Sequence, residues 1–418
     1  MRTLRTPDRT DCGSVLVLSL LLLVALGGLT TTLALYNLRL QAEHERARDD
    51  LRAFCVAEAG LNEAHAVLLA EGFAGARALA YPRATSSGSY AVELLDGRDD
   101  DSIDLDRVRL RSVGTAGRDP VGVQLMLYHV PTGKFRFAIF GAEGVRLNSN
   151  VVVDSYDPAD GPYPDKVEFV NDFGNVGSFD MIEIHANVSV YGDALVSETG
   201  VFDDGAPMVK VTGDQQAGEL EEEMPAITVP VLTSKGNLSV TSGATIPAGL
   251  HRYDSLAVTG GTLRIQGPAT VVVDNFTMTS KTALQIDTTG GPVTFYATGN
   301  VKLDSNSRIR TNNQSARDFE LLITSDNRKG GKTVDLSSNA EFVGTIYAPN
   351  ARLRLPSNFR VFGAVKAAQV ELASNGKIHF DEGLLYDPLA ADLFEVVSWR
   401  RLSRAEGDAV LAAGGSLP

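Results

Sequence analysis

The residues best able to do chemistry in this 418-residue chain are acidic groups in turn-like stretches. Hydrolysis of a glycosidic bond needs two carboxyl groups about 5–10 Å apart across the sugar. Three sets could supply them: Asp154, Asp157 and Asp160, or Asp203 and Asp204, or Asp381 and Glu382. None has an aromatic platform beside it, and the single tryptophan, Trp399, lies near the C-terminus. We interpret all three sets as solvated carboxylates and expect no enzyme.

The histidines predict no metal site. They do not occur as H-x-x-x-H or H-E-x-x-H, the spacings that place two zinc ligands on one helical face. His379 alternates with Ile378 and Phe380, so we expect it on the surface of the last strand. Gly331-Lys332-Thr333 is similar to the end of a phosphate-binding loop, but Asp326 stands where the first glycine is needed. We therefore expect neither metal nor cofactor. The four isolated histidines are His129, His185, His251 and His379.

The net charge argues against nucleic acid as a partner. The formal charge is −14, and no run of five or more basic residues occurs. A phosphate backbone is repelled by such a chain. The two cysteines, Cys12 and Cys55, flank an apolar segment and cannot pair across a membrane, so no disulfide framework is expected.

That apolar segment predicts a membrane anchor. Residues 14–38 carry no charge, and a helix needs about 20 residues to cross the hydrocarbon core. Arg2, Arg5 and Arg9 precede it, which predicts a cytoplasmic N-terminus and an exported remainder. A cleaved secretory signal is the alternative, although the apolar run is longer than such signals use. The localisation expected is therefore a bacterial inner membrane, with a single pass and a periplasmic or extracellular C-terminal part.

The helical pattern continues beyond the membrane. A stripe at alternating steps of three and four, together with the absence of proline from 14 to 81, predicts one helix of about 55–60 residues. We expect the stripe to pack on a small sheet. Its members are Leu51, Phe54, Glu58, Leu61, His65 and Leu68.

Two strings in this region resemble the start of PilX-type minor type IV pilins and related pseudopilin-like proteins. They are Gly13-Ser14-Val15-Leu16-Val17-Leu18 and Ala57-Glu58-Ala59-Gly60-Leu61-Asn62-Glu63-Ala64. The resemblance implies cleavage by a prepilin peptidase between Gly13 and Ser14, and packing against other pilin-like subunits. It departs from major pilins at Ser14, where they have Phe, and at Leu18, where they have Glu. In pilins a Glu in the bilayer needs a partner amine and thereby sets the register between subunits. This chain lacks that Glu, which argues against its incorporation into a filament.

Three alternating segments follow the helix, at residues 89–94, 108–113 and 123–127, and predict a three-stranded antiparallel sheet. Asp99-Asp100-Asp101 lies in the first turn and is interpreted as a solvated turn.

From residue 134 the sequence pattern changes and predicts short strands separated by a recurring L-x-S-N turn. Self-similarity of this kind predicts a solenoid. Asparagine accepts the left-handed backbone conformation at low cost, so it is expected at the corner of each turn. The irregular spacing favours a right-handed parallel β-helix of about ten coils, on the order of 50 Å long. The corner residues are Asn150, Asn306, Asn339, Asn358 and Asn375, with degenerate copies at 184–187, 240–243 and 278–281.

Alternate strand residues are predicted to fill the bore of this β-helix. We expect the core to include Leu256, Val258, Leu263, Ile265, Val271, Val273, Phe276, Met278, Leu284, Ile286, Phe295, Leu303, Ile323, Phe342 and Ile346.

A second resemblance covers residues 231–385. Gly344-Thr345-Ile346-Tyr347-Ala348-Pro349-Asn350-Ala351, Phe362-Gly363-Ala364-Val365 and Ile378-His379-Phe380-Asp381-Glu382 resemble the C-terminal β-helical domains of uncharacterised bacterial proteins. Related strings occur in polymer-forming surface solenoids. The resemblance implies architecture and no chemistry.

The sequence thus predicts a mainly β protein with a long N-terminal helix. Its parts are a leader (1–13), a transmembrane helix (14–38), a pilin-like helix extension and sheet (39–133), a β-helix (134–385) and a C-terminal cap with tail (386–418), in which 385–402 covers the final coil. The expected function is a non-enzymatic pilin-like envelope protein with a structural or adhesive head in a type IV pilus-like assembly. The alternatives are a membrane-tethered β-helix that binds or cleaves polysaccharide, and a self-stacking scaffold. The partners expected are the lipid bilayer, other pilin-like subunits, prepilin peptidase and surface polysaccharide.

Overall fold

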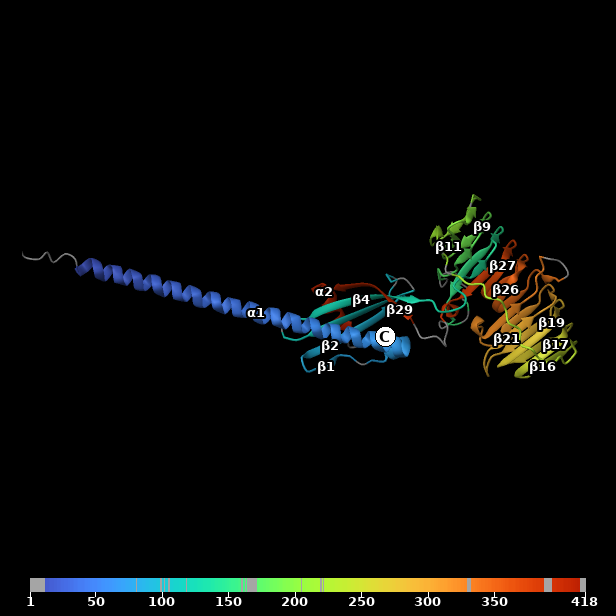
Figure 1. Ribbon diagram of the computed structural model, residues 1–418, viewed down its shortest axis with the longest axis horizontal. Coiled ribbons are helices and arrows are strands. Elements are labelled where there is room, and N and C mark those ends of the chain that lie inside the picture. Colours follow the sequence, from blue (N-terminus) through green and yellow to red (C-terminus); the bar gives the residue numbers. More distant parts are fainter. Residues whose placement is uncertain are drawn as a thin grey trace, which may run out of the picture. The chain divides into compact units, whose positions relative to one another are not determined.

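The computed structural model describes residues 12–79, 81–97, 100, 102–103, 106–117, 119–158, 161, 163, 171–203, 205–218, 220, 222–328, 332–386 and 393–413 (Figure 1). The chain divides into two compact units. Unit 1 combines Met1–Val130 with Ala391–Pro418, and unit 2 is Pro131–Ala390. The protein is mainly β with one long N-terminal helix.

Helix α1, Cys12–Arg77, spans 66 residues and has one non-helical residue, Gly72. Its first half is apolar and exposed. Within the described residues it is the one helix long and apolar enough to cross a membrane, over Val15–Phe73, and no residue of its most apolar window is buried. An uncovered apolar rod is unfavourable in water, because each buried methylene contributes about 0.8 kcal/mol. The helix therefore fits a single-pass membrane anchor.

The second half of α1 packs on an antiparallel sheet with strand order β1-β2-β3-β4-β29 (Figure 1). The middle strands β2, β3 and β4 contain the three predicted segments, while β1 and β29 were not predicted. The bounds are β1 Arg83–Thr85, β2 Gly88–Asp96, β3 Arg107–Thr115, β4 Val121–Val130 and β29 Leu393–Arg401.

Small residues bring the helix close to this sheet. Ala53 and Ala57 are fully buried, and a Cβ atom added at Gly60 would lie 2.6 Å from Ser112 Oγ. The string at residues 57–64 is therefore a packing surface in this structure. Of the predicted stripe, Leu51 is 61% exposed, because the contact face begins two residues later at Ala53.

The C-terminal segment belongs to unit 1. Strand β29 pairs antiparallel with β4, and helix α2, Arg404–Ala413, packs on the same sheet through Val410, which clusters with Val113 and with Leu402 from the segment before the helix. The predicted cap over the final coil of unit 2 is therefore wrong. The physical reason is that the last strand of unit 2 already has a strand partner, whereas the edge of β4 was open.

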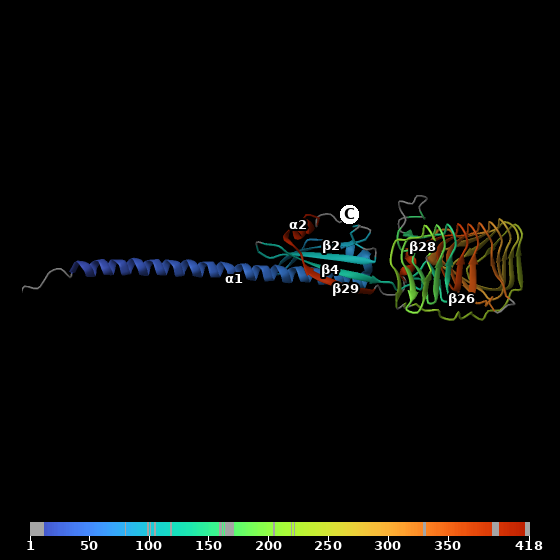
Figure 2. The ribbon, with the colours of Figure 1, turned by 90° about the horizontal axis from the view of Figure 1, so that it is seen from above.

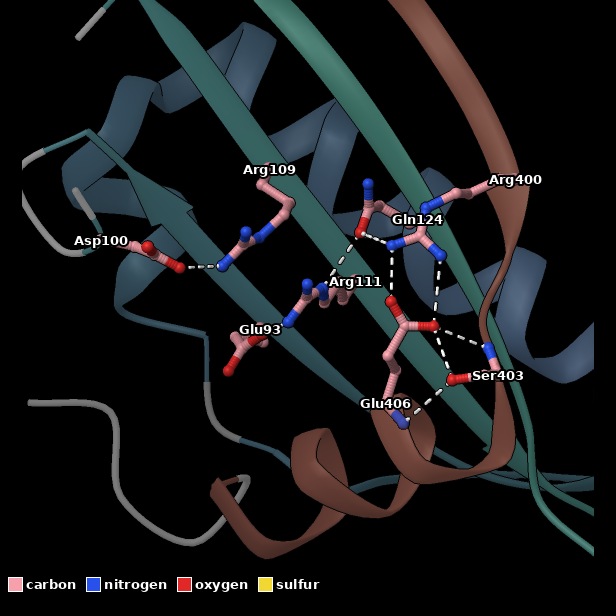
Figure 3. A network of polar contacts seen from close by, with 8 residues as sticks. All are labelled: Glu93, Asp100, Arg109, Arg111, Gln124, Arg400, Ser403 and Glu406. Atoms are coloured by element: carbon pink, nitrogen blue, oxygen red, sulfur yellow. Dashed lines mark hydrogen bonds and ion pairs between the residues drawn. The ribbon is translucent and has the colours of Figure 1, made fainter. Parts of the chain in front are cut away.

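A row of polar side chains ties the C-terminal segment to the sheet (Figure 3). Glu93, Arg111, Gln124 and Arg400 are cross-strand neighbours on β2, β3, β4 and β29. Arg111 Nε and Arg400 Nη2 both donate to Gln124 Oε1, at 3.1 and 3.0 Å. Arg400 also pairs with Glu406 of α2 at 2.7 Å. Opposite charges at facing positions stabilise such pairs.

Unit 2 is built from parallel strands, most of which pair with a strand two or three elements away along the chain. Two short 3₁₀ helices, η3 Ala316–Asp318 and η4 Glu382–Leu385, interrupt them. The strands are β5 Ile139–Gly141, β6 Val145–Leu147, β7 Val152–Tyr156, β8 Val176–Ser178, β9 Met181–Ile184, β10 Ser189–Val190, β11 Ala194–Ser197, β12 Val201–Asp203, β13 Lys210–Val211, β14 Gln215–Gly218, β15 Asn237–Val240, β16 Gly243–Ile246, β17 Gly249–Val258, β18 Thr262–Gln266, β19 Ala269–Met278, β20 Ala283–Asp287, β21 Val293–Ala297, β22 Val301–Leu303, β23 Arg308–Thr311, β24 Phe319–Ile323, β25 Val334–Leu336, β26 Glu341–Leu355, β27 Arg360–Leu372 and β28 Lys377–Asp381.

These strands form three rows, which together we call the stack. Row 1 holds β16, β18, β20, β23, the starts of β26 and β27, β28, β7, β10 and β13. Row 2 holds the starts of β17 and β19, β21, β24, the middles of β26 and β27, β5, β8, β11 and β14. Row 3 holds the remaining strands.

The chain does not pass through the stack from end to end. It enters in the middle, where β5 pairs with β27 and β7 pairs with β28, and runs to one end at β14. A crossing segment, residues 222–236, has no regular secondary structure, and β15 starts again at the opposite end. The red strands β26–β28 consequently lie between the green and the orange strands (Figure 2). The last strand is therefore internal and needs no cap.

The turns from row 3 to row 1 place all five predicted asparagines in the left-handed region, with φ between 59° and 63°. The N–H of each donates to a carbonyl of the next turn in the stack, at 3.1–3.3 Å. The bond from Asn375 to Ser149 carries this ladder across the point where the two chain segments meet. Asn187 and Lys281, from the degenerate copies, have the same conformation.

The interior of the stack is one apolar cluster. All fifteen predicted core residues are at most 2% exposed, which confirms the alternation predicted for these strands.

Candidate functional site

Two of the predicted residues meet where β28 pairs with β7. Their register sets His379 opposite Asp154. His379 Nδ1 lies 2.6 Å from Asp154 Oδ1, with both side chains buried, and the Tyr163 hydroxyl donates to Asp154 Oδ2 at 2.8 Å. The expectations of a surface His379 and a solvated Asp154 are therefore wrong. The facing strand lies 225 residues earlier in the chain, so local alternation could not reveal it.

Asp381 and Glu382 are also buried, at 0% and 5% exposure, which corrects their interpretation as solvated. Two backbone N–H groups donate to Asp381 at 2.8 and 2.9 Å. Burial nevertheless raises the pKa of Asp381 to about 6, and the charge of Asp157 adds to the rise. Glu382 Oε1 accepts hydrogen bonds from the Ser155 hydroxyl and the Asn171 amide, at 2.9 and 2.8 Å.

We call Asp154, Ser155, Tyr163, His379, Asp381 and Glu382 the junction cluster. Its carboxylates accept hydrogen bonds from inside the fold, and they are at most 5% exposed. A substrate could not reach them without local unfolding. Buried polar groups of this kind are stable only when they are paired, so the cluster specifies which strands join.

The remaining predicted acidic residues lie in different surroundings. Asp157 is 8% exposed, and Asp203 lies on the surface. Asp160 and Asp204 lie outside the described residues.

The other histidines are used separately. His129 stacks on Phe394 with ring centroids 4.6 Å apart, and His185 Nε2 lies 3.0 Å from Glu183. His251 is buried, and its Nδ1 lies 2.8 Å from Lys235 Nζ. In the part of the chain that the structure describes, no three His, Cys, Asp or Glu residues are grouped to hold a metal ion. The absence of a metal or cofactor stays a prediction.

A cleft of about 850 Å³ lies over row 2, and we call it the row 2 cleft. Its floor is a column of outward side chains, one from each neighbouring strand: Tyr296, Leu322, Tyr347 and Lys366. Adjacent parallel strands are about 4.8 Å apart, so the two tyrosines are separated by about twice that spacing. The crossing segment and residues 133–136 form the walls.

Two contacts fasten the crossing segment over this floor. Lys366 and Glu222 form an ion pair in which both side chains are at most 7% exposed. The Tyr347 hydroxyl donates to the carbonyl of Pro225 at 2.5 Å. Removal of one partner from a buried ion pair leaves an uncompensated charge in the protein interior, which is strongly unfavourable. The two contacts therefore hold the crossing segment in place as the wall of the cleft.

The cleft is electrostatically mixed. Burial raises the pKa of Glu320, and Lys134, 4.0 Å away, opposes the rise. Burial raises the pKa of Tyr347 to about 12, with the charges of Glu222 and Glu320 adding to it. The Glu320 carboxyl and two tyrosine rings can therefore bind a ligand that offers hydroxyl groups and flat apolar faces. The volume lies in the range of small-molecule sites.

Sequence reasoning missed this cleft, although a signal was present. The phrase Thr-x-Tyr-Ala occurs at 294–297 and again at 345–348, in two strands of row 2. Glu320 follows no such phrase. It enters the cleft only because β24 lies between these strands in the register.

The predicted cleavage residues, Gly13 and Ser14, lie in the first turn of α1, and their surroundings are outside what the structure describes. The turn asparagines join row 3 to row 1 and do not line the cleft.

Comparison with known proteins gives a family match for unit 2. Residues 183–385, just under half of the chain, match a family described as a domain of unknown function (DUF7305). No curated protein matches.

Several solved structures are similar in part. A competence-associated pilin, ComZ, from Thermus thermophilus is 12% identical, with a TM-score of 0.30, covering 85% of this chain and 97% of its own. An ice-binding protein, LeIBP, from an Arctic yeast is 12% identical, with a TM-score of 0.30, covering 63% and 95%. An ice-binding protein from the Antarctic ascomycete Antarctomyces psychrotrophicus is 11% identical, with a TM-score of 0.26, covering 59% and 98%.

Proposed function

We propose that this chain is a non-enzymatic, pilin-like envelope protein that displays a β-helical head. The observation that carries the proposal is the division of α1. Its first half is apolar and exposed, while its second half is buried on the antiparallel sheet of unit 1. The first half needs an apolar partner, which a bilayer or neighbouring helices of the same kind supply.

Polar groups in the exposed half support this placement. The hydroxyls of Thr30, Thr31 and Thr32 donate to carbonyls one helical turn earlier, at 2.7–3.0 Å. A hydroxyl that bonds back to its own helix presents no unsatisfied donor to lipid. The helix is therefore suited to an inner-membrane position from which it can enter a filament.

The head is proposed to be a right-handed parallel β-helix with a structural or adhesive role. Three rows of stacked parallel strands, joined by turns with left-handed corners, support this architecture. Because the crossing segment carries the chain to the opposite end of the stack, neighbouring coils of this β-helix are not always consecutive in the sequence. A head of this kind presents long flat faces, each with a regular column spacing.

N-terminal sequencing of the membrane-bound protein tests the pilin part. In a strain with prepilin peptidase the mature protein is expected to begin at Ser14, and Gly13→Leu is expected to keep the leader attached. Arg9→Lys is the control, because it leaves the processing residues intact. An N-terminus that is unchanged when the peptidase is deleted would remove the pilin part and leave the anchor.

The second candidate is binding or cleavage of polysaccharide in the row 2 cleft. The presence there of Glu320 and two tyrosines favours it, because glycoside chemistry uses carboxyl groups and aromatic faces. Release of reducing ends from a neutral glucan would be measured for the native protein, Glu320→Gln and the exposed control Glu198→Gln. Activity lost only in Glu320→Gln supports this candidate, and no release from the native protein excludes cleavage of that glucan.

A further inference from the structure

A second hollow of about 810 Å³ lies over row 1, and we call it the arginine groove. Its cations are Arg308 and Arg310 on β23, Arg360 on β27 and Lys377 on β28, all exposed. Among the described residues that line it, Glu341 on β26 carries the only carboxylate. The lining charge is therefore four positive groups against one negative, in a chain whose formal charge is −14.

The strand register fixes the spacing of these charges. Arg308 faces Glu341, Glu341 faces Arg360, and Arg360 faces Lys377 across successive parallel strands. Each step is about 4.8 Å. A linear ligand that crosses the strands at right angles therefore meets a charged group at every step.

The single carboxylate is already occupied. Glu341, 10% exposed at its side chain, accepts from Arg310 Nε at 2.5 Å and from Arg360 Nη2 at 3.0 Å. Arg310 and Arg360 remain about half exposed, so their outer N–H groups are available. Within the described chain, Arg308 and Lys377 make no ion pair. Arg360 and Lys377 face one another on adjacent strands, and their mutual repulsion favours a bound anion.

Neutral groups complete the groove. Phe362, which is partly exposed, supplies aromatic surface, and the exposed Gln285 supplies an amide. Thr311, 4% exposed, has a hydroxyl without a hydrogen-bond partner among the described residues. These are groups that fit rings and hydroxyls in addition to charge.

We propose that the arginine groove binds an acidic polysaccharide, a glycan chain with a carboxylate on its sugars, laid across the strands of row 1. Arginine binds carboxylates bidentately, which favours regularly placed uronate groups. The net charge of the chain opposes a long duplex of nucleic acid but not a short run of contacts. The inference rests on the proposed displayed head for its setting, whereas the binding can be measured whether or not the chain enters a filament.

The test uses full-length protein in detergent and a fluorescent oligogalacturonate, with binding followed by polarisation. The double variant Arg308→Gln with Arg360→Gln is expected to weaken binding by about tenfold or more, since two charge-assisted contacts to the ligand are lost. The matched control is Arg352→Gln with Arg354→Gln. Both arginines are exposed on the same stack, but they pair with Glu371 on row 3. This control is expected to bind like the native protein.

Further probes decide the ligand class. Neutral dextran should not bind, and raising the salt from 50 to 500 mM should weaken oligogalacturonate binding, because the contacts are exposed to solvent. Lys377→Gln gives an independent single variant if the double variant is unstable. Equal binding by the native protein and the groove variants would overturn the proposal. So would an oligothymidylate probe that binds more tightly than oligogalacturonate through the same arginines. Both results are independent of N-terminal processing.

Discussion

Single residues in this chain do two distinct jobs that depend on backbone shape and on burial. The turn asparagines hold φ near +60°, where a residue with Cβ pays a steric cost and where their N–H groups continue a ladder between turns. The junction cluster instead joins strands through buried charge and hydrogen bonds. The role of the turn asparagines is local and can be predicted from the sequence. The role of the junction cluster depends on partners that are distant in the chain.

Asn339→Ala is predicted to be less stable than Asn339→Gly by about 1 kcal/mol, because glycine adopts the left-handed region without a Cβ clash. Both variants lose the 3.0 Å side-chain bond from Asn358, so their difference isolates the backbone. Urea unfolding of the stack measures it. Asn237→Ala, on strand β15, is the control and should change little. Equal stability of the two Asn339 variants would contradict the prediction.

The buried Asp381 predicts a pH dependence of stability. Its pKa is raised to about 6 in the folded protein, so the folded state binds the proton more tightly than the unfolded state. The stabilisation is fully present below the ordinary pKa of an aspartate and is lost as the pH rises through about 6. Between pH 4.5 and 7.5 this group should lower the free energy of unfolding by about 2 kcal/mol.

Asp381→Asn should remove that difference, and urea midpoints at the two pH values measure it. The exposed Asp203→Asn is the control and should keep the native dependence. If Asp381→Asn retains the full pH dependence, the shift belongs to another group.

At the scale of elements, the sequence predicts what neighbours in the chain determine. The helix, the strands β2–β4, the turn corners and the core of the stack all follow from periodicity and from the chemistry of asparagine. Pairing between distant strands does not. The partners of β29 and β28 lie hundreds of residues away, and several partners satisfy the same alternation. The predicted cap and the predicted surface position of His379 were wrong for this one reason.

The order of strands in the stack predicts that the two fragments stay associated when the chain is cut in the crossing segment. Val231 in the crossing segment is 97% exposed, and the strands on its two sides meet again at β5–β27, β7–β28 and β4–β29. With a specific protease site inserted after Val231, the two fragments are expected to co-elute in gel filtration after cleavage. They should separate only in denaturant, because parallel pairing and a shared core hold them together. Separation in native buffer would show that the two segments do not share one stack.

The whole molecule combines an apolar rod, which requires a low-dielectric partner, with β-rich units that bury apolar cores of their own. Both properties occur within α1, whose residues from Ala53 to Leu68 belong to the core of unit 1. The boundary between anchor and folded protein therefore lies inside one helix, and a chain cut at the right place should separate them.

Deletion of residues 1–40 is predicted to release the protein into the soluble fraction with both units folded, because the α1 residues whose burial the structure describes are buried only beyond residue 50. Deletion of residues 1–77 is predicted to unfold unit 1, since it strips the apolar face of β2–β4 of its cover. Membrane fractionation with a carbonate wash measures the first effect, and circular dichroism with limited proteolysis measures the second. The full-length chain, fractionated in parallel, should stay in the washed membrane pellet. If the shorter deletion also stays there, a surface other than the apolar rod holds this protein to the membrane.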